Sequence, residues 1–131
     1  MPLTIAECNA ILNAVLPGAS HASYSGNTSL FLSIHTGDPG DTGANEYTAY
    51  AGGVRLAITF GGAAARQGVS VVQVDFTGMG ATSGTPITYF GLWTAASGGT
   101  FKGGATLITP RSTASGDTLR FPAGSVTILA A

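Results

Sequence analysis

The chain has 131 residues, enough for one domain that buries about two-thirds of its unfolded surface. Only 8% of the residues are charged and the formal net charge is −1, whereas a typical soluble domain is about 25% charged. Because near-zero net charge favours association, we expect a subunit that is largely covered by neighbours in an assembly. The alternative is a β protein kept in solution by its many small hydroxyl and amide side chains.

The positive charges are too few and too dispersed for a nucleic-acid partner. Binding to phosphates needs a positive face, but the five cations are offset by six acidic residues and are spread along the chain. They are Arg55, Arg66, Lys102, Arg111 and Arg120. No nucleic acid is therefore expected among the partners.

The start of the chain predicts a protein that folds in a cytoplasm and does not insert into a membrane. It lacks the basic region of a secretion signal, and no apolar run approaches the roughly 20 residues of a membrane span. Cys8 is the single cysteine, which excludes an internal disulfide. Its place in an apolar pattern favours a small buried residue over a reactive thiol.

Residues 1–18 predict one short helix that belongs to the same domain as the rest of the chain. Thr4 and Glu7 have the spacing of a capping box, and Pro17 with Gly18 ends the pattern. The helix would either cap one end of the β structure, which we favour, or dock onto a neighbouring subunit. Its apolar stripe consists of Ile5, Cys8, Ile11, Leu12, Val15 and Leu16.

Residues 19–131 predict an antiparallel β-sandwich or barrel of about seven short strands separated by turns. Residues 87–93 carry large apolar side chains on both faces, which is typical of a central strand, and Gly91 indicates a bulge or a close backbone approach. The turn at residues 122–124 predicts a hairpin between the last two strands. Strands are expected at 29–35, 54–60, 69–77, 87–93, near 100–109, at 118–121 and at 125–129.

A long loop at residues 36–53 is the best candidate for a functional segment, because loops of this length are uncommon in compact domains. Asp38, Asp41, Asn45 and Glu46 place four oxygen-bearing side chains within nine residues, and calcium takes oxygen ligands from such loops. Turn formation explains the two aspartates equally well. We therefore predict no metal site.

Residues suited to catalysis are sparse. His35 ends a strand close to Asp38, so a His–Asp contact is conceivable, but a histidine that bonds the loop backbone is the simpler interpretation. Asp75 and Asp117 are the acidic residues outside the loop and the first helix, and nothing indicates that they face each other across a cleft. We predict a non-enzymatic protein with no catalytic residue and no cofactor.

Aromatic residues leave carbohydrate binding open. Tyr89 and Trp93 fall on the same face of one strand, and Tyr47 and Tyr50 lie in the long loop, so these four rings could stack on sugars. Packing in the core is the alternative that we favour, because tyrosine and tryptophan contribute strongly to any core.

Four stretches in the same order resemble one family. Residues 35–46 (HTGDPGDTGANE) resemble the pattern H-T-x-D-P-G-x-x-G-x-x-E of small structural proteins of tailed bacteriophages. Residues 52–55 (GGVR), 90–99 (FGLWTAASGG) and 115–128 (SGDTLRFPAGSVTI) resemble further segments of the same proteins. The resemblance is to the minor tail or tail-fibre type found in phages of actinobacteria. It departs from the family pattern at Thr94, where an acidic residue is usual.

The resemblance implies a structural protein of the virion, assembled in the host cytoplasm and present in many copies at a tail tip or fibre. Its partners would be copies of itself and other virion proteins, with a host cell-surface glycan as a further candidate. A head-decoration protein that cements the capsid, or a carbohydrate-binding module for host attachment, are the alternatives. The family implies no catalytic residues.

Overall fold

The computed structural model describes residues 3–15, 29–65, 67–82 and 84–129. In these residues one helix precedes nine short strands, all paired antiparallel and not closed into a barrel. The predicted class, mainly β with a short N-terminal helix, is confirmed. The elements are α1 (Ile5–Val15), β1 (Leu30–His35), β2 (Glu46–Tyr47), β3 (Leu56–Ile58), β4 (Gln67–Val69), β5 (Val74–Met79), β6 (Ile87–Trp93), β7 (Phe101–Arg111), β8 (Asp117–Phe121) and β9 (Thr127–Leu129).

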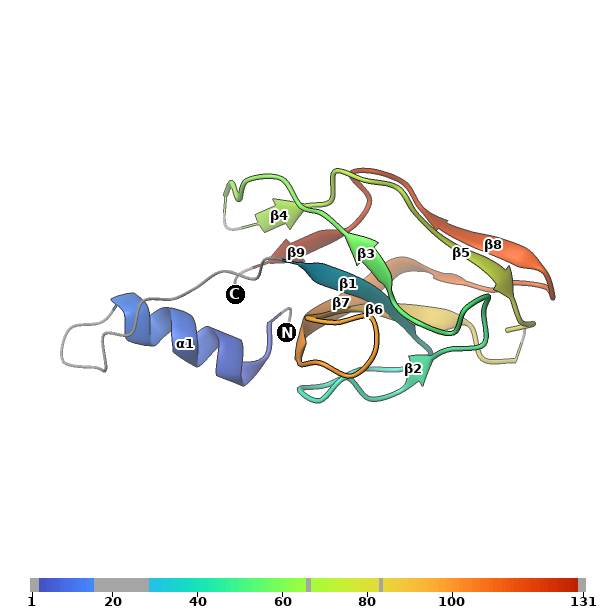
Figure 1. Cartoon of the computed structure of the whole chain (residues 1–131), viewed down its shortest axis with the longest axis horizontal. Helices are drawn as coiled ribbons and strands as arrows, with labels where there is room; N and C mark the ends of the chain where they lie inside the picture. Colours follow the sequence, from blue (N-terminus) through green and yellow to red (C-terminus); the bar gives the residue numbers. More distant parts are fainter. Residues whose placement is uncertain (1–2, 16–28, 66, 83, 130–131) are drawn as a thin grey trace.

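The main sheet has the strand order β2-β1-β6-β7, and β3 also pairs with β1. β6 lies inside this sheet between β1 and β7, as its apolar residues on both faces predict. Two short pairs, β5–β8 and β4–β9, complete the structure. Figure 1 shows the β5–β8 pair lying over the main sheet as a second layer.

The core lies between these two layers. The ring of Tyr50 meets the edge of Phe76 with 4.9 Å between ring centres, and Phe76 meets Phe121 at 5.9 Å. Tyr50 comes from the long loop after β1, so the end of that loop is part of the core. Fully buried side chains from both layers include Leu32, Ile34, Phe76, Met79, Ile87, Leu119 and Val126.

Two predicted strands are shorter or divided. The strand predicted at 69–77 is wrong as one element, because the chain changes partner at Val71, which is 54% exposed, and forms β4 before and β5 after it. The strand predicted at 54–60 is reduced to β3. The backbone N–H of Arg55 donates to the carbonyl of Ala96, outside the sheet, which delays the start of the strand.

The predicted hairpin between the last two strands is also wrong. β8 pairs with β5, and β9 pairs with β4. The turn at 122–124 is present, but it carries the chain from one pair to the other. Ser70 stands at this crossing: its carbonyl accepts from the N–H of Gly124 and its hydroxyl oxygen accepts from the N–H of Val126.

The predicted end of the helix at Pro17 and Gly18 lies outside the described residues. No helix in the part of the chain that the structure describes has the length and apolar character needed to cross a membrane.

Candidate functional site

Residues 36–53, predicted as one long loop and here called the signature loop, contain the short strand β2 and are joined to the segment before β3 by an ion pair. Nε and Nη2 of Arg55 donate to the two carboxylate oxygens of Glu46, each at 2.9 Å. The two side chains are only 10% and 17% exposed. A bidentate pair of this kind is directional, and at this degree of burial it is weakly screened by salt.

The same guanidinium reaches the turn after β6. Nη1 of Arg55 donates to the carbonyls of Ala95, at 3.2 Å, and Gly98, at 2.7 Å. Cζ of Arg55 also lies 3.5 Å from the centre of the Trp93 ring, in a cation–π contact. One arginine therefore joins three of the four stretches that carry the family resemblance.

A chain of hydrogen bonds beneath this contact fixes the start of the loop. Nε1 of Trp93 donates to the hydroxyl oxygen of Ser33, at 2.9 Å. Ser33 Oγ lies 2.7 Å from Nε2 of His35, and Nδ1 of His35 lies 2.7 Å from the carbonyl of Ala44. A carbonyl only accepts, so Nδ1 of His35 carries a proton, and in the neutral imidazole that burial favours Nε2 accepts from Ser33.

Two glycines make this packing possible. A Cβ at Gly91 would lie 2.6 Å from Oγ of Ser33, which confirms the close approach predicted from a glycine inside β6. A Cβ at Gly43 would lie 2.4 Å from the ring of Trp93. Gly43 also has φ +79°, a conformation that favours glycine.

The signature loop in turn holds the N-terminal helix. Oδ1 of Asp41 accepts from the backbone N–H of Ile5, at 2.7 Å, in the first turn of α1. The predicted capping box is confirmed on one side: the hydroxyl of Thr4 accepts from the N–H of Glu7 at 3.2 Å. Carboxylate Oε2 of Glu7 pairs with Nζ of Lys102 on β7, at 2.7 Å. The helix is thus joined to the β body by polar contacts at its first turn.

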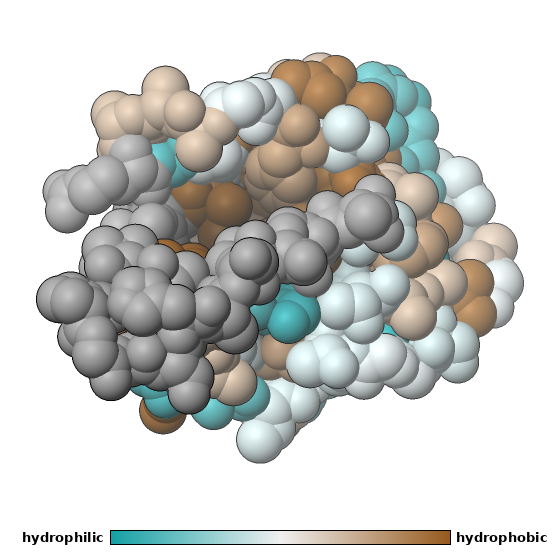
Figure 2. Space-filling view, turned by 60° about the vertical axis from the view of Figure 1, so that its left-hand side comes forward, coloured by the Kyte–Doolittle hydropathy of each residue, from teal (hydrophilic) through white to brown (hydrophobic). Residues whose placement is uncertain are grey.

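Two residues of the apolar stripe of α1 are exposed, while Cys8 and Ile11 are half-buried. Ile5 is 55% exposed and Leu12 is 51% exposed. Figure 1 shows α1 at one end of the molecule, extending away from the sheets. The predicted packing of this stripe against one end of the β structure therefore does not hold for Ile5 and Leu12. In Figure 2, which brings this end forward, the coloured residues are mostly white to brown, with teal limited to separate patches.

The acidic residues of the loop are all engaged in structure. Oδ1 of Asp38 accepts from the N–H of Gly40 in a turn, Asp41 receives the N–H of Ile5, and Glu46 pairs with Arg55. No group of three or more potential metal ligands occurs in the residues that the structure describes. The carboxylates therefore serve turn formation, helix capping and an ion pair.

Candidate catalytic groups have structural partners as well. His35 contacts Ser33 and the loop backbone, not Asp38. The side chains of Ser33 and His35 are fully buried and therefore out of reach of a substrate. Burial is the main reason why the pKa of His35 is lowered. Asp75 pairs with Arg120, whose hydrogen bond lowers the pKa of Asp75, and Asp117 accepts from the N–H of Ala114.

Of the four aromatic residues considered for sugar stacking, Tyr50 lies in the core and the other three are half-buried. Tyr50 is 7% exposed, and burial raises its pKa to about 12. Trp93 has Arg55 over its ring and Phe101 at its edge, with 5.2 Å between ring centres. Tyr47 and Tyr89 are half-buried.

Sequence reasoning missed Ser33 and the contact of Asp41 with the helix, because neither has a local signal.

The fold and this network define a β-rich structural module in which three of the four stretches that carry the resemblance are held together by Arg55. The chain belongs to the family of the podophage GP4 fiber I protein gp80, whose model matches residues 3–129. It is therefore a phage fibre protein, a structural component of the virion. No curated protein matches the chain. The resemblance drawn from the four stretches is confirmed at the level of a phage fibre protein.

Proposed function

We propose that this chain is a multi-copy subunit at a tail tip or tail fibre, and that α1 attaches its β body to neighbouring subunits. The observation that carries the proposal is the exposed apolar stripe of α1, in which Ile5 and Leu12 are each about half exposed. The proposal includes the minor-tail position and the actinobacterial type of phage that the four stretches favour.

The physics of short helices supports this role for α1. An isolated helix of 11 residues is marginally stable in water. The first turn is held by Asp41 and by the pair between Glu7 and Lys102, whereas Ile5 in that turn and Leu12 two turns later are each about half exposed. Full burial of an isoleucine or leucine side chain contributes about 1.5–3 kcal/mol, so a neighbour that covers both residues would stabilise the helix and the assembly together.

The composition supports the same conclusion. With 8% charged residues, the surface lacks the charge density that normally keeps free monomers apart. The cores of protein interfaces are depleted in charged residues. A subunit covered by copies of itself and by other virion proteins would have this composition.

The first experiment compares two double variants of the purified chain by sedimentation velocity over a range of concentrations. We expect the unmodified chain to associate and the variant with Ile5→Ser and Leu12→Ser to remain monomeric. The variant with Val54→Ser and Val71→Ser is the matched control, because these valines are 44% and 54% exposed on the β body. The control should still associate, and circular dichroism should show that both variants fold.

The second experiment places the chain in the particle. Gold-labelled antibody against the chain, viewed on intact phage by electron microscopy, should mark the tail end. Label spread over the head would make it a capsid decoration protein and would overturn the tail position. The proposed role of α1 is excluded if two results are found together. The unmodified chain would stay monomeric at all concentrations, and the variant with Ile5→Ser and Leu12→Ser would be incorporated into phage particles as well as the unmodified chain.

A further inference from the structure

β7 bulges out of the main sheet between Thr106 and Arg111 and forms one wall of an open pocket. Tyr89 pairs with Thr106 and Ile87 with Arg111, so two steps along β6 are matched by five steps along β7. Residues 107–110, here called the β7 excursion, therefore stand off the sheet, and Ile108 is fully exposed. The pocket has a volume of about 220 Å³ and is lined by Leu107, Ile108, Thr109, Arg111, Arg120, Phe121, Pro122 and Ser125.

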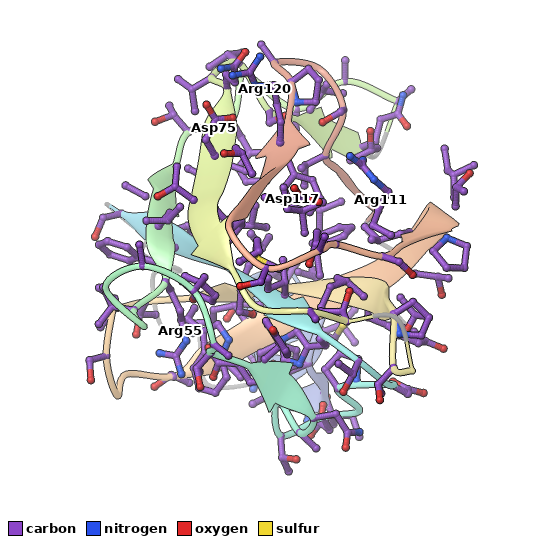
Figure 3. The ribbon with its side chains drawn as sticks, turned by 90° about the vertical axis from the view of Figure 1, so that its right-hand side faces the viewer. Arg55, Asp75, Arg111, Asp117 and Arg120 are labelled. Atoms are coloured by element: carbon purple, nitrogen blue, oxygen red, sulfur yellow. The ribbon has the colours of Figure 1, made fainter. Side chains whose placement is uncertain are left out.

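The charges of this pocket are both positive. Arg111 and Arg120 line it, and none of the lining residues is acidic. Arg120 is partly neutralised by Asp75, because its Nε and Nη2 donate to the two carboxylate oxygens at 2.9 and 3.2 Å. Arg111 is in no ion pair with the residues that the structure describes. Figure 3 shows Asp75 and Arg120 together on β5 and β8, while Arg111 reaches toward the chain after β8.

The rest of the lining is suited to a ring with hydroxyl groups. Ile108 and Pro122 offer apolar surface, and Thr109 contributes a hydroxyl. The hydroxyl of Ser125 donates to the carbonyl of Pro122, at 2.7 Å, so towards a ligand its oxygen can only accept. Pockets for drug-sized ligands span roughly 300–1,000 Å³, so this smaller volume suits one small unit. One free guanidinium beside apolar and hydroxyl groups matches a carboxylate on a polyhydroxylated ring.

We propose that the pocket between the β7 excursion and the turn after β8 binds an acidic saccharide unit, with Arg111 as the residue that receives its carboxylate. A guanidinium presents two N–H groups in a plane that fits a carboxylate. An extended polyanion such as nucleic acid is disfavoured, because it needs a positive face larger than one free arginine. The proposal concerns a site on the β body and does not depend on the role of α1.

The test uses trigalacturonate as the acidic probe and its fully methyl-esterified form as the neutral control. Saturation-transfer NMR with the full chain should show binding of the acid and not of the ester. Arg111→Gln should weaken binding about tenfold, because hydrogen bonds to charged groups are the stronger class. Asp75→Asn, which releases Arg120, should tighten binding by about twofold to fivefold. Both substitutions are at the surface, so both variants should fold.

A third variant separates charge from geometry. Arg111→Lys keeps the charge but not the planar pair of donors, so its affinity should lie between those of the unmodified chain and Arg111→Gln. The proposal is overturned if the chain binds neither probe, if it binds acid and ester equally, or if Arg111→Gln leaves binding of the acid unchanged. It is also overturned if a polyglutamate peptide binds in place of trigalacturonate, since the site would then recognise an acidic peptide.

Discussion

Arg55 and Trp93 are 38 positions apart in the sequence, yet the guanidinium carbon lies 3.5 Å from the centre of the indole ring. Arg55 at the same time binds Glu46 of the signature loop through two hydrogen bonds. The ring is therefore covered by a charge that is itself neutralised and nearly excluded from water. This contact fixes the signature loop, and the loop carries Asp41, which caps α1.

Replacing Arg55 by lysine should destabilise the protein by about 1.5–3 kcal/mol, the scale of lost hydrogen bonds to a charged group. Lysine keeps the charge but cannot bind both oxygens of Glu46, reach two carbonyls and stack on Trp93 together. Arg111→Lys is the matched control, because Arg111 is exposed, and it should change stability by no more than about 0.5 kcal/mol. Urea unfolding at one fixed protein concentration measures both. Equal stabilities would contradict the structural role of Arg55.

Replacing Gly43 by alanine should disturb Trp93 directly. The new Cβ would lie 2.4 Å from the indole ring at a residue with φ +79°, so we expect a loss of about 2 kcal/mol or more. Gly40→Ala is the control, since it has φ +60° with nothing within 4 Å and should show only the backbone cost. Trp93 is the only tryptophan, so its fluorescence should shift in the first variant alone. Identical spectra for both variants would mean that the loop can move away from the ring.

Acidification should weaken the fold through His35. Burial lowers the pKa of this imidazole below its ordinary 6.5, so the unfolded chain binds a proton more readily than the folded one. Stability is therefore fully present above about pH 6.5 and falls as the pH drops from there toward the lowered pKa. Glu46 opposes this shift, and Arg55 reinforces it.

The variant His35→Asn isolates this effect, because the second histidine, His21, is present in both proteins. The unfolding free energy of the unmodified chain should decrease between pH 7 and pH 5 more steeply than that of the variant. Parallel pH profiles would show that His35 does not titrate differently on folding.

Removing the carboxylate of Asp41 should loosen the first turn of α1. Asp41→Ala leaves the N–H of Ile5 without its acceptor, at a cost of about 0.5–2 kcal/mol. Amide hydrogen exchange in α1 should accelerate, with little change in β1 or β6. Asp41→Asn keeps an acceptor oxygen and should lose only the interaction of the charge with the helix dipole, about 0.3–1 kcal/mol. Equal acceleration in both variants would assign the effect to the charge alone.

Local patterns in the sequence determined much of this protein. The capping box at Thr4 predicted α1, the alternation of apolar residues predicted β1, and apolar residues on both faces predicted that β6 is central. Turn chemistry predicted that Asp38 bonds its own backbone, as it does at Gly40. These features depend on interactions between near neighbours, and the phage resemblance was visible for the same reason, because its stretches are continuous.

Partners that are distant in the sequence were decided only by the tertiary structure. The turn at 122–124 reads locally as a hairpin, but β8 and β9 gain more by pairing with β5 and β4, because that arrangement buries Leu119 and Val126 in one core. The contacts of Arg55 with Trp93 and of Asp41 with Ile5 likewise join segments whose spacing carries no pattern. The alternation of apolar residues and the chemistry of the turns determine which residues form strands. Burial of apolar surface across the whole chain determines which strands pair.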